Sequence, residues 1–426
     1  MNDIYKLCLC GVMCLFTVAV YCDVYKVTDY YQAGDISSAE AIGRAITAAN
    51  ANNGGEIFFP PGMYEVHQTI YVKKNLTFEG NSGPGGSSVI QAKAGSSAFN
   101  LFACFNTDAT NVVFKNLVID LNGLSGGGEA TGIGIYIHND TNFNGADSVT
   151  GVLIENCEIK NGSSHGIRGY NSAIDYSVPF QLRIENCKIH SCALWGILIQ
   201  SATDAIISGS EIYGCNNGGI MFYFGKNQII KSCSVHDNGN SPSYNGIEIK
   251  CAVNWKVTDN TIKMNKGKGV FAHARTSTDP NIKNFIISGN ILDGNEGGNI
   301  KVDPSIDSTT LFDVYGIIAD NICSGYTGTN GIEVKLATNV IISGNICKDN
   351  TNASGIYVFG KYCVVGNNIS SGNGNGIYFH TTSSFNQNPL GSHVVNQNRL
   401  YSNTTNILLD TGLQSINSTL TEDLSQ

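Results

Sequence analysis

The sequence has little charge and little proline, and beyond its first segment it has no long apolar run. Only 14% of the 426 residues are charged, and there are 8 prolines against 49 glycines. The formal net charge of −9 argues against nucleic acids and anionic membrane surfaces as main partners. After residue 22 no segment is apolar enough to span a bilayer. The remaining composition is turn-rich and weakly charged, which favours a β protein.

Metal-binding cysteine spacings such as C-x-x-C are also missing, so we expect no metal site of that type. Four of the 14 cysteines lie within the first 22 residues. Several of the others occupy apolar positions of the repeat described below. We therefore expect buried free thiols, with Cys323 and Cys347 as the best candidate pair for a disulfide if they stack.

Residues 1–22 have the pattern of a secretory signal peptide. Lys6 precedes the apolar run "LCLCGVMCLFTVAV", and Val20 and Cys22 fit the small positions before a cleavage site. The alternative is an uncleaved anchor. Cleavage would release a secreted or cell-surface protein that has no membrane span after signal removal.

One phrase recurs along most of the chain, and residues 340–360, "VIISGNICKDNTNASGIYVFG", show it best. Its apolar and small positions are I-x-x-N-x-I, then a short polar run, then G-I-x-V. The spacing of 22 to 41 residues between successive copies indicates a solenoid, and the period of two within each copy indicates strands. The asparagine position is held in turn by Asn116, Cys157, Cys187, Ser210, Cys233, Asn260, Asn290, Asn321, Asn345, Asn367 and Asn398. If like residues stack about 4.8 Å apart, an Asn there can bond the amides of its neighbours.

The phrase resembles the coil repeat of right-handed parallel β-helix proteins of the pectate-lyase-like superfamily, over roughly residues 111–410. The resemblance implies an all-β fold, a single-stranded right-handed parallel β-helix of about 11 to 12 coils. Such a fold hosts lyases, hydrolases, epimerases, tailspikes and adhesins, so it does not define one activity.

Ahead of the repeats, "SSAEAIGRAITAANANNGG" at residues 37–55 predicts an amphipathic helix that caps the open end of the solenoid. Ser37 and Glu40 form a capping-box pattern at its start. This helix, the Gly-Gly pair and the strand–Pro-Pro-Gly–strand that follows resemble the entry of the rhamnogalacturonase and epimerase-like pectate lyase domain. We divide the chain into a signal peptide (1–22), a cap helix with the first strands (23–110), β-helix repeats (111–410) and a C-terminal tail (411–426).

After each Gly-Ile pair the strand alternates inward and outward, so the outward residues should form vertical columns. In coil order the outward pairs are Tyr136/His138, Arg168/Tyr170, Leu198/Gln200, Met221/Tyr223, Glu248/Lys250, Phe271/His273, Lys301/Asp303, Glu333/Lys335, Tyr357/Phe359, Tyr378/His380 and Leu408/Asp410. The opposing corner strand is expected to carry mostly small and neutral residues. The columns have a titratable centre with aromatic residues on either side, which suits a polysaccharide lying along the stack.

The centre of the columns predicts chemistry on an anionic, uronate-containing glycan. A cation would neutralise the uronate carboxylate, a base would take the adjacent proton, and an acid would protonate the leaving oxygen or the opposite ring face. The base would be Lys250 or His273, and the cation Lys301 or Lys335. The candidate catalytic residues are Lys250, His273, Asp303, Lys335, Glu248 and Glu333. The candidate substrate-binding residues are Lys301, Phe271, Tyr223, Tyr357, Tyr378, Tyr136, His138, Arg168 and Tyr170.

Other interpretations remain open. Two carboxylates such as Asp303 and Glu333 could hydrolyse a glycosidic bond, which needs a separation of about 5 to 9.5 Å. Opposite charges on neighbouring strands could also be ordinary ladder pairs. The N-T-D, D-D and G-H-G signatures of polygalacturonases and the D-P-H-E of mannuronan epimerases are missing, and "HGIRGYNS" at residue 165 stands in the place of the latter.

The function predicted from the sequence is that of a secreted lyase or epimerase acting on an acidic polysaccharide. The alternatives are a glycoside hydrolase of the same fold and a non-catalytic carbohydrate-binding, tailspike-like or adhesive surface protein. No cofactor is evident; calcium stays open, but the acidic cluster that binds it in pectate lyases is not evident. A homotrimer with chains associated along their axes also stays open.

Overall fold

The computed structural model describes residues 23–409, apart from gaps at 84, 106–108, 140–148, 172–179, 275–281, 305–310, 326 and 381–392, together with the strand Ile416–Thr419. The predicted signal peptide and most of the predicted tail lie outside the described residues. Secretion and the cleavage site therefore stay predictions. Among the residues described, none of the helices has the length and apolar character that a membrane crossing requires.

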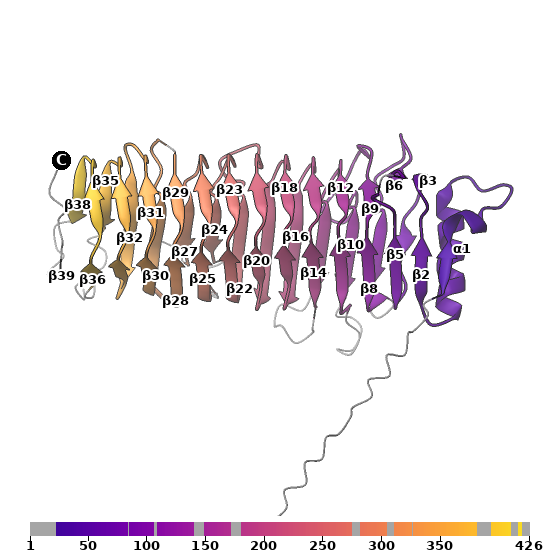
Figure 1. Cartoon of the computed structure of the whole chain (residues 1–426), viewed down its shortest axis with the longest axis horizontal. Coiled ribbons are helices and arrows are strands. Elements are labelled where there is room, and N and C mark those ends of the chain that lie inside the picture. Colours follow the sequence, from indigo (N-terminus) through magenta and orange to yellow (C-terminus); the bar gives the residue numbers. More distant parts are fainter. Residues whose placement is uncertain are drawn as a thin grey trace, which may run out of the picture.

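The chain winds into a long parallel β-helix in which every coil contributes strands to three walls (Figure 1). In each coil the chain runs along wall B, turns at the Asn corner, runs along wall C, turns again and runs along wall A. All the pairings between coils are parallel, and wall C is a sheet of 13 strands. Walls A and B form one continuous sheet because several strands turn from one wall into the other without a break.

The strands of the three walls are as follows. Wall A, which follows the Gly-Ile pairs, contains β4 (Ile70–Tyr71), β7 (Phe102–Phe105), β10 (Ile135–Asn139), β13 (Ile167–Asn171), β16 (Trp195–Thr203), β19 (Gly218–Lys226), the start of β22 (Ile247–Thr258), β24 (Val270–His273), β27 (Ile300–Asp303), the start of β30 (Ile332–Ser343), β32 (Ser354–Lys361), β35 (Asn375–Phe379) and β38 (Thr405–Leu409). Wall B contains β1 (Val24–Lys26), β2 (Gly55–Phe58), β5 (Leu76–Glu79), β8 (Val112–Lys115), β11 (Val152–Glu155), β14 (Leu182–Glu185), β17 (Ile206–Ser208), β20 (Ile229–Lys231), the end of β22, β25 (Lys283–Ser288), β28 (Phe312–Ala319), the end of β30, β33 (Val364–Gly366), β36 (His393–Asn396) and β39 (Ile416–Thr419). Wall C contains β3 (Gly62–Val66), β6 (Ser88–Ala92), β9 (Leu117–Asp120), β12 (Glu158–Lys160), β15 (Lys188–His190), β18 (Glu211–Tyr213), β21 (Ser234–His236), β23 (Thr261–Lys263), β26 (Ile291–Asp293), β29 (Ile322–Ser324), β31 (Ile346–Lys348), β34 (Ile369–Ser371) and β37 (Arg399–Tyr401).

The predicted amphipathic helix is α1 (Ser38–Ala51), preceded by the short 3-10 helix η1 (Val27–Tyr30). The capping box is present: the Ser37 side chain accepts from the Ala39 N–H, and the Ser37 N–H donates to Glu40 at 3.1 Å. Figure 1 shows α1 at the N-terminal end of the stack. Its buried face, which includes Ile42 and Ile46, belongs to the same apolar core as the first strands.

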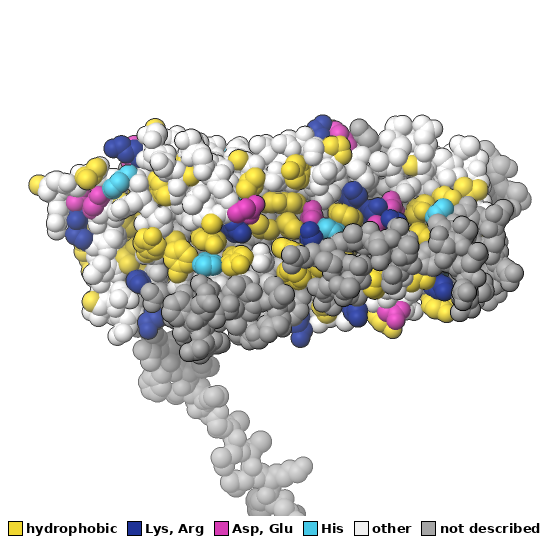
Figure 2. Space-filling model, turned by 180° about the vertical axis from the view of Figure 1, so that it is seen from behind, with side chains coloured by type: hydrophobic (Ala, Val, Ile, Leu, Met, Phe, Trp, Pro, Cys, Tyr) yellow, Lys and Arg dark blue, Asp and Glu magenta, His cyan; other side chains and the backbone are white. Residues whose placement is uncertain are grey.

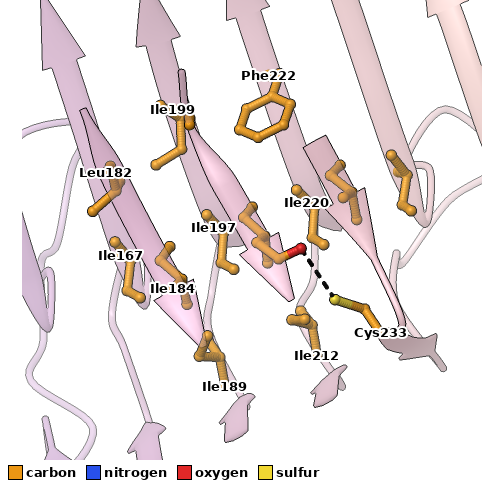
Figure 3. Packing of buried hydrophobic residues seen from close by; sticks show 14 of the residues in the cluster. Ile167, Leu182, Ile184, Ile189, Ile197, Ile199, Ile212, Ile220, Phe222 and Cys233 are labelled. Atoms are coloured by element: carbon orange, nitrogen blue, oxygen red, sulfur yellow. Dashed lines mark hydrogen bonds between the residues drawn. The ribbon is translucent and has the colours of Figure 1, made fainter. Parts of the chain in front are cut away.

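The core is a column of stacked aliphatic side chains from all three walls. Figure 3 shows how Ile167, Ile197 and Ile220 repeat along wall A, with Ile189 and Ile212 of wall C facing them across the interior. These side chains are completely buried. Because each coil is too thin to bury them alone, the core exists only where coils stack.

The Asn corner between walls B and C confirms the predicted asparagine ladder. The Asn260 N–H donates to Asn290 Oδ1 at 3.0 Å, and the Asn290 N–H donates to Asn321 Oδ1 at 3.0 Å. Their amide groups also bond carbonyls of the neighbouring coil, as Asn290 Nδ2 does with Val257 O at 2.9 Å. These side chains are buried and fully hydrogen-bonded, so they fix one coil upon the next.

Two residues assigned to this ladder were placed one position too early. Asn116 and Asn367 have positive φ values of 58° each, so they form the left-handed turn just before the ladder position. The ladder position itself holds Leu117 and Asn368, and the Asn368 N–H donates to Asn398 Oδ1 at 3.0 Å. Asn tolerates the left-handed backbone, which places it at the turn as readily as in the ladder.

A second ladder, not predicted from the sequence, lies at the corner between walls C and A. The Asn238 N–H donates to Asn265 Oδ1 at 3.1 Å, and the Asn265 N–H donates to Asn295 Oδ1 at 3.2 Å. The same arrangement joins Asn350 and Asn373 at 3.0 Å. Two of the three corners are therefore held by buried amides.

The ten cysteines outside the leader are all buried free thiols, as predicted. Cys323 and Cys347 stack on neighbouring strands of wall C but are not bonded to each other. Burial raises the pKa of Cys233 to about 11 and that of Cys363 to about 12. These thiols therefore behave as small core residues.

We predict that Asn290→Ala lowers the free energy of unfolding by about 3 kcal/mol, because buried backbone and amide groups on both neighbouring coils lose their partners. Urea unfolding at neutral pH measures this. Asn240→Ala is the matched control: Asn240 is exposed and its side chain makes no hydrogen bond among the described residues, so the unfolding midpoint should stay unchanged. Equal effects of the two changes would contradict the structural role of the ladder.

Candidate functional site

Wall A brings the predicted outward residues that the structure describes into two columns; Asp410 lies outside the described residues. Glu248 pairs in register with Phe271, which pairs with Lys301, which pairs with Glu333. In the second column Lys250 pairs with His273, and His273 pairs with Asp303. Figure 2 shows a face on which charged, histidine and hydrophobic side chains gather in a band along the long axis of the molecule.

His273 and Glu248 form a contact at the centre of wall A. His273 Nε2 lies 2.9 Å from Glu248 Oε1, and His273 Nδ1 lies 2.8 Å from the carbonyl oxygen of Ala274. The carbonyl and the carboxylate oxygens are both acceptors, so Nδ1 and Nε2 are both donors in this arrangement. The other Glu248 oxygen accepts from Asn245 Nδ2 at 2.8 Å. Glu248 is only 8% exposed, so this group is held rigidly beneath the surface of the wall.

Lys301 lies between two carboxylates. Its Nζ is 2.8 Å from Glu333 Oε1 and 3.6 Å from Asp303 Oδ2. Lys335 Nζ approaches the same Asp303 oxygen at 3.3 Å. Burial acts to lower the pKa of Lys301, but Glu333 and Asp303 outweigh it and raise that pKa. Lys301 is therefore a permanent cation at neutral pH.

Lys268 belongs to the same cluster but was not predicted. It lies at the corner before wall A, and its Nζ sits 4.7 Å from the centre of the Phe271 ring. Burial, and then the charge of Lys301, lower the pKa of Lys268, whereas Glu333, Glu248 and Asp303 act in the opposite direction. Residues at a corner do not alternate between inward and outward as strand residues do. The two-residue alternation used to predict the outward columns therefore could not identify Lys268.

Lys250 and Lys268 differ from the other two central lysines. Lys250 Nζ lies 5.2 Å from the centre of the Tyr223 ring, and Lys268 Nζ lies over the Phe271 ring in a similar way, at 4.7 Å. Within the part of the chain that the structure describes, neither ammonium has a carboxylate within 4 Å, whereas Lys301 and Lys335 both do. The cluster therefore holds two cations that face aromatic rings and are not neutralised by a direct ion pair.

Aromatic groups flank this centre on wall A. On the N-terminal side, Arg168 lies 6.0 Å from the Tyr136 ring and 5.6 Å from the Tyr170 ring, and His138 packs against both tyrosines. On the C-terminal side, the rings of Tyr357, Tyr378, Phe359 and His380 contact one another. Arg168, Tyr136 and Phe359 are largely buried, whereas the rings of Tyr170, Tyr357 and Tyr378 are half-buried and remain partly open to solvent.

The expectation of a mostly neutral opposing strand is wrong for wall C. The rings of His190, Tyr213 and His236 stack with centroids 4.7 and 5.1 Å apart. Glu158 contacts His190 at 3.1 Å and Glu211 contacts His236 at 3.3 Å. From β26 to β34 the outward residues of wall C are Ile with Asp, Ser or Lys, so the aromatic and histidine side chains gather on its earlier coils.

No three or more His, Cys, Asp or Glu side chains among the described residues are placed to hold a metal ion. In the central cluster, four lysines, a histidine and three carboxylates could neutralise an anionic group, accept a proton and donate one.

Comparison with known proteins supports the fold. A family model described as a right handed beta helix region matches residues 133–308. The chain is similar to the A-module of the Azotobacter vinelandii mannuronan C-5 epimerase AlgE6, with 16% identity over 91% of this chain and 98% of that one, at a TM-score of 0.59. It is also similar to the catalytic unit of a GH87 α-1,3-glucanase from Streptomyces thermodiastaticus, with 15% identity over 87% and 67% of the two chains, at a TM-score of 0.56.

A third similar structure is the enzymatically active domain of tailspike protein 2 of bacteriophage CBA120, with 11% identity over 93% of this chain and 54% of that one, at a TM-score of 0.51. A search of curated proteins by sequence finds no match. At these identities the likeness establishes the fold alone, and the predicted right-handed parallel β-helix is confirmed.

We predict opposite effects on stability of removing two half-buried lysines, Lys268 and Lys301. The lowered pKa of Lys268 means that its charge is disfavoured in the folded state at neutral pH, so Lys268→Met should leave the free energy of unfolding within about 0.5 kcal/mol or raise it. The raised pKa of Lys301 means that its charge stabilises the fold below the ordinary lysine pKa. Lys301→Met should therefore cost about 2 kcal/mol at pH 7.

Urea unfolding of both variants at pH 7 tests this contrast. The charge of Lys301 stops contributing to the free energy of unfolding only when the pH rises through the raised pKa of its folded state. The difference in the free energy of unfolding between Lys301→Met and the wild type should therefore be unchanged from pH 6 to 9. A larger loss for Lys268→Met than for Lys301→Met would show that the electrostatic description of the cluster is wrong.

Proposed function

We propose that this protein, which folds as a right-handed parallel β-helix, acts on a polysaccharide that lies along wall A, and that it is a lyase or epimerase of an acidic, uronate-containing glycan. The observation that carries the proposal is the arrangement around Lys301. A cation held by Glu333 and Asp303 lies beside two lysines that have no direct carboxylate partner. An anionic sugar would complete the charge balance of this group.

The reaction begins with the removal of the proton next to the uronate carboxylate. A lysine ammonium beside the carboxylate makes that proton more acidic, since it stabilises the negative charge that develops on the carboxylate. In a lyase the electron pair then forms a carbon–carbon double bond while the bond to the leaving oxygen breaks, and an acid protonates that oxygen. In an epimerase the proton returns to the opposite face of the same carbon.

The residues divide into roles according to their environment. Lys301, with its raised pKa, is suited to neutralise the substrate carboxylate. Lys268, whose pKa is lowered, joins Lys250 as a candidate base, because a lysine must lose its proton before it can accept one. His273, predicted as a base, donates to two acceptors in this structure and is suited to the role of the acid. Glu248 orients the His273 ring and Asp303 positions Lys335. The aromatic groups on either side offer flat surfaces to neighbouring sugar rings.

The likeness to a mannuronan C-5 epimerase module supports a role on acidic polysaccharides. We place the protein outside the cell, where such glycans occur, on the strength of the leader pattern in residues 1–22.

Association of three chains along their axes, as suggested by the elongated solenoid, is part of the same proposal and is tested by light scattering. The proposal invokes no cofactor.

A glycoside hydrolase is the second candidate, and one observation favours it. Asp303 and Glu333 both contact Lys301, so their nearer oxygens are separated by no more than the sum of those two contact distances, 3.6 and 2.8 Å. That upper limit is compatible with the separation of about 5 to 5.5 Å between the paired carboxylates of retaining glycosidases. The likeness to a glucanase and to a tailspike domain supports this alternative.

Incubation of the purified protein with alginate, pectin and bacterial capsular polysaccharides tests the proposal. New ultraviolet absorbance from unsaturated ends identifies a lyase, and a changed proton NMR spectrum without chain cleavage identifies an epimerase. Reducing ends without new absorbance identify a hydrolase. Binding without any product identifies a non-catalytic carbohydrate-binding protein and contradicts the enzymatic proposal.

We predict that Lys250→Ala and His273→Ala each abolish product formation, and that Lys268→Met lowers the rate at least about a hundredfold, because each removes a proton-transferring or charge-neutralising group. Lys256→Ala is the matched control, since Lys256 is exposed on wall B of the same strand, β22. Full activity in Lys250→Ala and His273→Ala would show that the reaction takes place elsewhere on wall A.

A further inference from the structure

A group of buried polar atoms without hydrogen-bond partners lies around β13, away from the central cluster. Within the part of the chain that the structure describes, the unpartnered side-chain atoms of this group are Ser163 Oγ, Ser164 Oγ, His165 Nε2, Arg168 Nε and Arg168 Nη1. Burying such atoms without partners is costly, so their concentration at one place indicates a ligand. Three of them, on His165 and Arg168, are nitrogen atoms that can donate.

Two of these donors, His165 Nε2 and Arg168 Nη1, lie near one carboxylate oxygen. The backbone N–H of Trp195 donates to His165 Nδ1 at 3.3 Å, and burial lowers the pKa of His165. The ring is therefore neutral at pH 7, with its proton on Nε2, which lies 3.6 Å from Glu129 Oε2. Arg168 Nη1 lies 3.3 Å from the same oxygen. Both contacts leave the donors without a hydrogen bond of good geometry.

Glu129 differs from its two partners in exposure. Its side chain is 71% exposed, whereas the side chains of Arg168 and His165 are 10% and 0% exposed. The contact with His165, with the charge of Arg168 acting in the same direction, lowers the pKa of the Glu129 carboxyl. A charged carboxylate on an exposed, glycine-rich excursion thus approaches a buried donor set from the solvent side.

We propose that Arg168 and His165 form a binding site for the carboxylate of an acidic sugar residue, and that Glu129 occupies this site until the glycan displaces it. Arginine with a second donor is suited to a carboxylate, because two charge-assisted hydrogen bonds can form at once. The rings of Tyr136 and Tyr170 beside the guanidinium offer contact to the sugar itself.

The position of this site fits a chain bound along wall A, and in this respect the inference rests on the proposed function. Five steps of strand pairing separate Arg168 on β13 from Lys301 on β27. At about 4.8 Å for each step the two sites are about 24 Å apart. A long uronate chain could place one carboxylate at Lys301 and another at Arg168, whereas a disaccharide could reach only one of them.

The test is a titration of the wild type, Glu129→Gln and Arg168→Gln with long oligogalacturonate and oligomannuronate, followed by NMR of the His165 ring and by calorimetry. Glu129→Gln should bind at least about threefold more tightly, because the internal competitor loses its charge. Arg168→Gln should bind about tenfold more weakly, the effect of one lost charge-assisted hydrogen bond. Neutral cello-oligosaccharides should leave the His165 signal unchanged in all three proteins.

Glu129→Gln alters an exposed side chain and keeps the test valid if Arg168→Gln does not fold. Arg183→Gln is the matched arginine control, since Arg183 is 58% exposed on wall B. Unchanged or weaker binding in Glu129→Gln, or unchanged binding in folded Arg168→Gln, overturns the inference. If the binding results overturn this site but product still forms, the proposed function is unaffected. If binding follows the predicted pattern but no product forms, the site is supported and the proposed enzymatic reaction is contradicted.

Discussion

The whole structure depends on the parallel, in-register stacking of coils that satisfy one another's polar groups. A single coil leaves its backbone groups, its corner asparagines and its aliphatic side chains without partners. The neighbouring coil supplies all three, as Asn290 does for Asn260 and as Asn321 does for Asn290. Because like stacks on like, a residue that faces outward in one coil faces outward in every coil. The functional columns of wall A are a direct consequence of this constraint.

The same stacking determines the electrostatics of wall A. Neighbouring outward residues are held about 4.8 Å apart, so charges of opposite sign on adjacent coils meet as Lys301 and Glu333 do. On an open surface such pairs contribute only a few tenths of a kcal/mol. Here Glu248 and Asp303 are each only 8% exposed, so their contacts act in a less polar environment and hold the neighbouring cations in place. That rigidity distinguishes a preorganised site from an ordinary ladder.

The sequence was sufficient for the strand order and for the outward columns, because both follow from the period of two after each Gly-Ile pair. It misplaced Asn116 and Asn367, since Asn suits the left-handed turn and the adjacent ladder position equally well. Lys268 was missed because corner residues do not follow the alternation of strands. The contact of Glu129 with Arg168 joins an excursion to a strand of the next coil, and no local pattern could predict it.

The central claim is that a polysaccharide binds along wall A with an acidic sugar at Lys301. A crystal structure of the protein with a bound uronate oligosaccharide tests it most directly. The account predicts sugar density that runs parallel to the long axis across β22, β24, β27 and β30, with a sugar carboxylate within hydrogen-bonding distance of Lys301 Nζ. Sugar bound instead on wall C, beside His190, Tyr213 and His236, or on wall B, would contradict it.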